Sequence, residues 1–267
     1  MDWDEMARPW LEAAPGLEAS FQEVFKALFD AAELKSGEHV LDVGCGTGPT
    51  LLTAAEAVGE TGRLVGIDVA PPLVARAAER VPSRVDLIVG DAGSYAYDEG
   101  TFDAIIANFG IMFFQDNLAA FRNLRRAVKQ GGRMAATVWA TPPENPWFSM
   151  PRRIVDDKIA DVPRPDPTGP GPMRFGDPSV IAKYLESAGW EPEISTIDVL
   201  LTPPGTAENV AELHMKVTVG MMLKGIDVAE SKLDELKSAV IQETRTHETD
   251  GVVRVPARIH VVTATAR

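Results

Sequence analysis

Short apolar segments alternate with segments of helical periodicity through the first 140 residues. Five segments that are apolar almost throughout have the length of buried strands, and they lie at residues 39–43, 63–69, 85–89, 102–108 and 133–139. Apolar residues recur at helical spacing before and between them, at residues 18–34, 49–58, 72–80 and 118–129. Apolar strands that alternate with helices predict an α/β fold, in which a parallel sheet is covered by helices on both faces.

Proline changes this pattern after residue 140. Ten of the twenty prolines lie between Pro142 and Pro178, where we expect an ordered excursion or lid with no long helix and no central strand. The regular pattern then resumes. It predicts a helix at 179–188, strands at 193–201 and 258–265, and two helical segments between these strands, near 210–221 and 229–248.

A single domain is expected, because 267 residues lie near the upper limit for one core. We divide it into N-terminal cover helices at 1–34, a regular core at 35–140, a Pro-rich lid at 141–178, and a C-terminal part at 179–267 with a helical insertion at 206–248.

Charge and cysteine content narrow the possible partners. The formal net charge of −13 opposes binding to nucleic-acid phosphates, so we expect no nucleic-acid partner. Cys45 is the only cysteine, which excludes an intrachain disulfide and a thiolate zinc cluster and fits a reducing compartment. The N-terminus lacks the pattern of a secretory signal, and the least polar window, 104–114, is shorter than the roughly 20 residues that span a bilayer. We therefore expect a cytoplasmic protein without a membrane span.

The stretch HVLDVGCGTGPT places an acid near the end of the first predicted strand and three alternating glycines directly after it. Gly44, Gly46 and Gly48 allow a tight turn and a close approach of the backbone to a ligand, at which the next helix points its amides. The dinucleotide fingerprint requires glycine in the sixth position, which is Pro49 here. Asp42 would repel a pyrophosphate and attract an ammonium or sulfonium group, so the loop favours a cationic nucleoside over a dinucleotide.

Two further acids end the next two predicted strands. Asp68 follows the loop by about 20 residues, where a carboxylate can accept both hydroxyls of a ribose. Asp91 can accept a hydrogen bond from an adenine amino group, with Ala92 supplying a backbone amide. Because ligands bind at the carboxyl ends of parallel strands, we expect all three acids to line one site.

These stretches resemble the successive motifs of class I S-adenosylmethionine-dependent methyltransferases. The resemblance rests on VLDVGCGTG, GIDVA, GDAGS and FDAIIANFGIMFF, in that order and spacing, and on LRRAVKQGGRMAATVW, which is similar to the family's next helix, glycine turn and strand. It covers about residues 35–140 and is nearest to small-molecule enzymes of the ubiquinone and menaquinone methyltransferase type, from whose common core the Pro-rich stretch and the insertion depart. It implies a Rossmann-like sheet of seven strands, mostly parallel, with an antiparallel last strand, and S-adenosyl-L-methionine as cofactor.

The resemblance also implies which residues hold the cofactor. Asp42 and the three glycines would hold the methionine part, Asp68 the ribose, and Asp91 with Ala92 the adenine. Leu73 would pack on the adenine ring, and Asn108 would lie beside the sulfonium with its backbone carbonyl near the amino group. The neighbouring Cys45, Thr47, Val69 and Phe109 belong to the same expected set.

Transfer of a methyl group from a sulfonium is an in-line displacement, so the protein mainly orients the reactants and excludes water. We expect no metal. An acceptor amine or phenol can still need a base, for which His214 is the candidate, because it lies at the apolar border of the predicted insertion helices. A half-buried packing histidine is the competing interpretation, whereas His39 and His260 are expected to be structural.

Aromatic residues near the predicted strand ends indicate a small, apolar or aromatic acceptor. The expected lining of its pocket is Trp3, Trp10, Trp139, Trp147 and Met215. The competing interpretation is that these side chains close the core. Two other functions stay open, namely an oxidoreductase that uses NAD(P) and a module that binds S-adenosylmethionine without catalysis.

Overall fold

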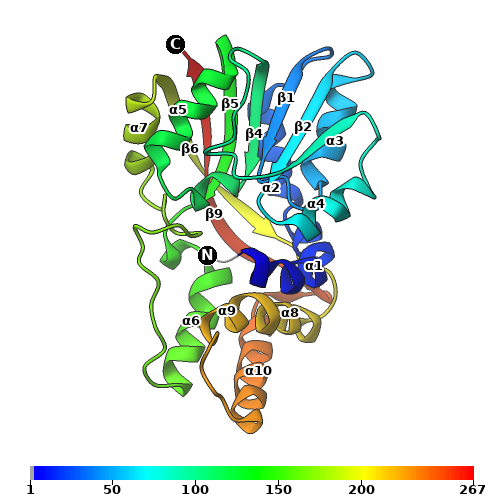
Figure 1. Cartoon of the computed structure of the whole chain (residues 1–267). Helices are drawn as coiled ribbons and strands as arrows, with labels where there is room; N and C mark the ends of the chain where they lie inside the picture. Colours follow the sequence, from blue (N-terminus) through cyan, green and yellow to red (C-terminus); the bar gives the residue numbers. More distant parts are fainter. Residues whose placement is uncertain (1–2) are drawn as a thin grey trace.

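A seven-stranded mixed sheet forms the centre of the upper part of the molecule (Figure 1). This computed structural model describes residues 3–267, with side chains from Met6 onward. The strands lie in the order β3-β2-β1-β4-β5-β9-β6. Their bounds are β1 His39–Val43, β2 Arg63–Asp68, β3 Val85–Val89, β4 Phe102–Asn108, β5 Val128–Trp139, β6 Trp190–Leu201 and β9 Val255–Ala266. Strands β1 to β5 pair in parallel, and β9 is antiparallel to both β5 and β6. The predicted fold is confirmed, including its antiparallel last strand.

Helices cover both faces of this sheet. The helices are α1 Trp3–Ser20, α2 Gln22–Ala32, α3 Pro49–Val58, α4 Pro71–Ala78, α5 Asn117–Ala127, α6 Pro146–Lys158, α7 Pro178–Ser187, α8 Ala207–His214, α9 Gly220–Met222 and α10 Glu230–Arg245, with a 3-10 turn η1 Gly110–Phe113 and a π-helical turn η3 Met215–Val219. Val40 belongs to a core cluster with α2 and α3, and its neighbour Leu41 to another with α5 and α7. Successive residues of β1 therefore point to opposite faces, and both faces are buried.

Strand β5 begins earlier than predicted. Phe102 pairs with Val128, and the next pair along the ladder joins Ala104 to Arg133. The glycine turn at Gly131 and Gly132 is therefore taken up as a bulge within the strand, whereas the sequence pattern placed the start after it.

The prediction that residues 141–178 contain no long helix is wrong. Helix α6 has thirteen residues. Pro146 stands in its first turn, where a missing N–H costs nothing, and only Pro151 lies inside it. The buried side chains recur at helical spacing, at Trp147, Met150, Pro151, Ile154 and Val155. Burial of this face offsets the hydrogen bond that Pro151 cannot make, which proline content alone did not reveal.

Helices α6, α8, α9 and α10 form a second part below the sheet, and α1 lies between the two parts (Figure 1). This helical part has an apolar cluster of its own, which includes Met150, Val155, Leu236 and Val240. A small hairpin, β7 Glu248–Thr249 with β8 Val252–Val253, connects α10 to β9. Within residues 3–267, no helix combines the length and the apolarity that a bilayer crossing needs.

Candidate functional site

The loop after β1 has the conformation that its glycines predict. Gly44, Gly46 and Gly48 all have positive φ angles, of 72°, 53° and 86°. A Cβ at Gly44 would lie 2.9 Å from the Cα of Gly110, and one at Gly48 would lie 3.0 Å from a methyl group of Val81. A Cβ at Gly46 would meet nothing within 4 Å. Two glycines thus allow close packing behind the loop, whereas Gly46 faces open space where a ligand can approach the backbone.

Asp42 is buried next to this loop, with 1% of its surface exposed. Its Oδ2 accepts a hydrogen bond from the Thr50 hydroxyl, and its Oδ1 has no partner. Burial raises the pKa of Asp42 to about 7. A buried carboxyl group with a free oxygen is suited to a cationic ligand group, because such a group would restore the ionised form.

Asp68 joins the loop to the end of β2. Its Oδ2 accepts from the backbone N–H of Gly46 at 2.9 Å, and its Oδ1 accepts from that of Ala70 at 2.9 Å. Burial raises the pKa of Asp68. The structure therefore brings Asp42, the glycine loop and Asp68 together, as the sequence predicted.

Asp91 lies at the third strand end and is exposed. Its carboxylate accepts hydrogen bonds from the N–H of Gly93 at 2.8 Å and the hydroxyl of Ser94 at 3.0 Å, so it also shapes its own turn. Ala92 beside it is buried.

Exposed apolar side chains gather at the ends of β2 and β3. Val69 is 39% exposed, Val89 is 52% exposed and Tyr95 is 37% exposed. Val69 was predicted to be near the ligand, whereas Val89 and Tyr95 were missed. No sequence pattern marks them, because they are distinguished only by their exposure, at an edge where apolar side chains have little reason to face solvent.

Helix α1 covers Leu73, the residue expected beneath an adenine ring. Ala7, Trp10 and Leu11 of α1 form one cluster with Ala70 and Leu73, and Leu73 is only 2% exposed. Trp10 therefore contacts the side of the site where the nucleoside is expected, in addition to the main core.

Thr47 has partners that sequence reasoning missed. Its hydroxyl donates to Glu18 of α1, and its carbonyl accepts from Arg80 at 3.0 Å. Cys45 in the same loop is buried, and burial raises the pKa of its thiol.

Four aromatic rings meet at the ends of β4 and β5. Phe109 and Trp139 are stacked at 4.1 Å with an interplanar angle of 8°, Phe21 lies 5.5 Å from Phe109, and Phe148 lies 5.1 Å from Trp139. Phe109 has a φ angle of 61°, a strained value for a bulky residue that often marks a functional position. We call these four residues the aromatic wall. Asn108, just before it, accepts a hydrogen bond from the Thr137 hydroxyl at 2.8 Å.

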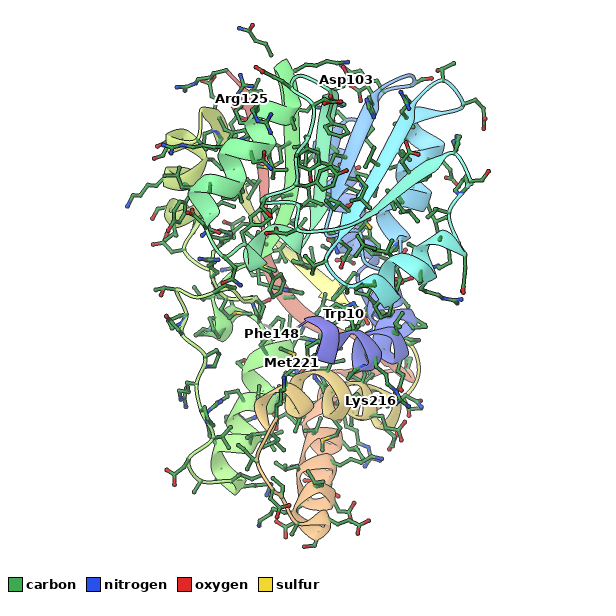
Figure 2. All side chains as sticks on the ribbon, in the orientation of Figure 1. Trp10, Asp103, Arg125, Phe148, Lys216 and Met221 are labelled. Carbon is green, nitrogen blue, oxygen red and sulfur yellow. The ribbon has the colours of Figure 1, made fainter. Side chains whose placement is uncertain are left out.

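Helices α1 and α6 both contact η3. Figure 2 shows the labelled Trp10, Phe148 and Met221 in one region between the sheet and the helical part, and all three pack against the main core cluster.

The remaining predicted site residues lie in the helical part. His214 is fully buried, its ring lies 4.2 Å from that of Trp147, and its Nε2 has no partner. Burial lowers the pKa of His214 to about 3. Met215 lines a pocket of about 420 Å³ with Val219, Leu223 and other residues of the insertion. The side chain of Trp3 lies outside the described residues.

The two histidines expected to be structural lie in strands. The Nε2 of His260 donates to the Gly176 carbonyl at 3.0 Å, and its Nδ1 is hydrogen-bonded to the Thr196 hydroxyl at 2.8 Å. These bonds tie β9 to β6 and to the end of the Pro-rich stretch. His39 begins β1, away from the glycine loop, and packs on Phe102.

Comparisons with known proteins point to one domain family. A family model described as a methyltransferase domain matches residues 40–132. Nocamycin O-methyltransferase of Saccharothrix syringae is 35% identical over 184 residues, which are 64% of this chain and 65% of that protein. Demethylmenaquinone methyltransferase of Shouchella clausii is 32% identical over 114 residues, or 41% of this chain and 48% of that protein. The chain thus spans about half to two thirds of the length of these curated relatives.

A solved structure shows the same fold over most of the chain. The YcgJ protein of Bacillus subtilis aligns with a TM-score of 0.60, covering 92% of this chain and 98% of its own, at 16% identity. At that identity the likeness concerns the fold alone.

Proposed function

We propose that this chain, in which a methyltransferase-domain model matches residues 40–132, transfers the methyl group of S-adenosyl-L-methionine to a small organic acceptor. The observation that carries the proposal is the meeting of two acids and an open glycine loop at adjacent strand ends. Asp42 and Asp68 flank the loop, and Gly46 donates directly to Asp68 at 2.9 Å.

The residues of this edge fit a cationic adenosyl ligand. The unpartnered Oδ1 of Asp42 can accept a hydrogen bond from an ammonium group or balance a sulfonium charge. The open space at Gly46 lets a ligand contact the loop backbone. Val69 and Tyr95 present apolar surface beside Asp91, which suits a planar base.

S-adenosylmethionine bound here would supply a methyl group already activated for displacement. The side chains of Asp68 and Asp91 would orient the ribose and the adenine, and Asn108 would lie beside the reacting centre. Phe109 and Trp139 are buried at the ends of β4 and β5, where they would keep water from the reacting centre and so favour in-line transfer over hydrolysis.

The acceptor is proposed to have an apolar or aromatic body and a hydroxyl group. This proposal is supported by the aromatic wall and by Trp10 and Met221, which pack against the same core cluster and give this region an apolar, aromatic character. A hydroxyl acceptor is supported by the relative named as an O-methyltransferase. Trp10, Trp139 and Trp147 belong to the pocket in this proposal, and the role of Met215 stays a prediction.

A catalytic role for His214 also stays a prediction. An imidazole with a pKa of about 3 is neutral but is a poor base near neutral pH. Its unpartnered Nε2 can take a proton from the methyl acceptor only if that molecule reaches past Trp147.

The two alternative functions are less well supported. A nicotinamide-dependent oxidoreductase would place a pyrophosphate beside Asp42, and Pro49 stands where the dinucleotide fingerprint has its third glycine. A module that only binds the cofactor would share every feature of the strand ends, so turnover must be measured.

The test has two stages. Calorimetric titration should show binding of S-adenosylmethionine and of its demethylated product; absence of both would overturn the proposal. The protein is then incubated with a cell extract and a donor carrying an isotopically labelled methyl group, and mass spectrometry should find label in a small organic compound. The variant Asp68→Ala serves as the matched control and should lose most of that label. Binding without transfer of label would support the non-catalytic module. The cytoplasmic location and the absence of a nucleic-acid partner remain part of this proposal.

A further inference from the structure

Helix α1 is held between the two parts of the molecule. On one side Ala7, Trp10 and Leu11 pack on Ala70 and Leu73 at the start of α4. On the other side a Cβ built on Gly16 would lie 3.4 Å from a methyl group of Leu213 of α8, and α1 contacts η3. Figure 1 shows α1 crossing below the sheet, directly above α8 and α9. Any ligand that packs on Leu73 must therefore share space with α1 or displace it.

Glu18, near the end of α1, is bonded to two other segments. Its Oε1 accepts from the Thr47 hydroxyl of the glycine loop and, at 2.8 Å, from Nη1 of Arg80. Its Oε2 accepts from Nη2 of Arg80 at 2.8 Å. Arg80 follows α4 and donates in turn to the Thr47 carbonyl at 3.0 Å. One carboxylate and one guanidinium thus join α1, the glycine loop and the end of α4.

This ion pair is shielded from water more than its neighbours are. The side chains of Arg80 and Glu18 are 26% and 19% exposed, whereas those of the nearby pair Arg76 and Glu79 are 54% and 65% exposed. The hydrogen bond with Glu18 raises the pKa of Arg80, so the guanidinium stays charged. A bidentate, partly buried pair is worth more than an exposed one and is screened less by salt.

We propose that Glu18 is a positioning residue, which holds the glycine loop in its binding conformation and keeps α1 closed over the nucleoside site, so that cofactor exchange requires the pair with Arg80 to open. The inference rests on the proposed function. It adds a residue outside the strand ends that governs how long the cofactor or its product stays bound. Product release often limits the turnover of enzymes. The pair would therefore set the rate of product release as well as the position of α1 and the glycine loop.

The test measures release of radiolabelled S-adenosylhomocysteine into an excess of unlabelled compound. Glu18→Gln keeps the shape and an acceptor for Thr47 but removes the charge, and Arg80→Gln removes its partner. We expect each variant to release the product about tenfold faster, and the double variant no faster than either single one, because the two residues act as a pair. The double variant Arg76→Gln, Glu79→Gln is the matched control and should release at the wild-type rate.

The salt dependence of product release distinguishes this role of Glu18 from a purely structural one, which would leave that dependence unchanged. Raising the ionic strength from about 0.05 to 0.5 M should speed release from the wild type and from the control, and should change release from Glu18→Gln much less. Unfolding temperatures, measured in parallel, show whether a variant is folded. Wild-type release rates in a folded Glu18→Gln, or an unchanged salt dependence, would overturn the inference. Failure of the wild type itself to bind the compound would instead overturn the proposed function, and this inference with it.

Discussion

The buried carboxyl group of Asp42 leads us to expect that cofactor binding depends on pH. Its folded-state pKa of about 7 lies above the ordinary value of about 3.9, because the carboxyl group is buried. Between these values the folded chain holds a proton at Asp42 that the unfolded chain has lost. The contribution of this group to stability is therefore fully present below about pH 4 and is lost as the pH rises through 7. A bound cationic ligand favours the ionised carboxylate and therefore lowers the pKa of Asp42 in the complex.

We therefore expect S-adenosylmethionine to release close to one proton when it binds at pH 6, and its affinity to fall by up to about tenfold per pH unit below 7. Titration calorimetry in two buffers of different ionisation enthalpy measures the proton. Asp42→Asn should abolish this release, and Asp86→Asn, which changes an exposed acid on β3, should leave it intact. Equal proton release from wild type and Asp42→Asn would show that another group titrates.

Asp68→Ala should weaken cofactor binding by one to two orders of magnitude. The variant removes the acceptor for Gly46 N–H and the expected partner of the ribose hydroxyls, which together are worth on the order of 1.5 to 3 kcal/mol. Asp86→Ala is the control. Titration of both variants with S-adenosylhomocysteine checks the expectation, and unchanged affinity in Asp68→Ala would show the ribose assignment to be wrong.

His214→Phe separates packing from catalysis. The phenyl ring keeps the contact with Trp147 and removes an Nε2 that has no partner, but it also removes the weak hydrogen bond between Nδ1 and the Thr218 hydroxyl at 3.4 Å. We therefore expect the free energy of unfolding to fall by about 1 kcal/mol. Because burial holds the pKa of His214 near 3, we also expect methyl transfer to stay within a few-fold of wild type. If His214 is a general base, His214→Phe should instead lower kcat by about 100-fold or more.

The sequence indicated the acids at the strand ends but not their partners. Asp42, Asp68 and Asp91 could be predicted because each lies near the carboxyl end of an apolar strand, and parallel strands end at one edge. The contact between Glu18 and Arg80 joins residues 62 positions apart and has no local pattern, so it could not be predicted. Val89 and Tyr95 could not be predicted either, because only the exposure of their side chains in the structure distinguishes them.

Among the secondary-structure elements, the turn between β4 and η1 is the tightest point of the site. A Cβ on Gly110 would lie 2.3 Å from the Val43 carbonyl oxygen and 3.2 Å from the Cα of Gly44. Both neighbours are backbone atoms and cannot move aside without displacing the glycine loop. The end of β4 and the loop after β1 therefore depend on each other.

Gly110→Ala should lower the free energy of unfolding by more than about 2 kcal/mol, because the new methyl group overlaps backbone. Urea unfolding measures the change. Gly171→Ala is the matched control, since a Cβ there meets nothing within 4 Å and its φ is not positive, and we expect a change within about 1 kcal/mol. Equal stability of Gly110→Ala and Gly171→Ala would contradict the close approach.

Helices outside the regular core were harder to predict. The spacing of Val210, Leu213 and Val217 indicated one helix, but the structure changes to a π-helical turn at Met215–Val219. One widened turn leaves the apolar spacing almost intact, so the pattern does not reveal it, although such turns often occur near functional sites. In α6 the tertiary contacts of Asn145 fix the start: its side chain donates to the Arg258 carbonyl at 3.0 Å and accepts from the Arg258 N–H at 3.1 Å.

At the scale of the whole molecule, α1 connects a sheet and a helical part that each have an apolar core. Ala7 and Leu11 of α1 pack on the residues that follow β2, whereas Gly16 faces the helical part at Leu213. Loss of either part would expose one side of α1. The two parts should therefore unfold together, as the prediction of a single domain requires.

We accordingly expect one thermal transition, shifted as a whole by S-adenosylhomocysteine. A ligand present at 100 times its dissociation constant adds about 2.7 kcal/mol to the stability of the folded state. In a chain of this size each kcal/mol raises the midpoint by about 2 to 4 °C, so the shift should be about 5 to 10 °C. Differential scanning calorimetry with and without the compound measures it. Two transitions, of which only one moves with ligand, would mean that the helical part folds independently of the site that α1 covers.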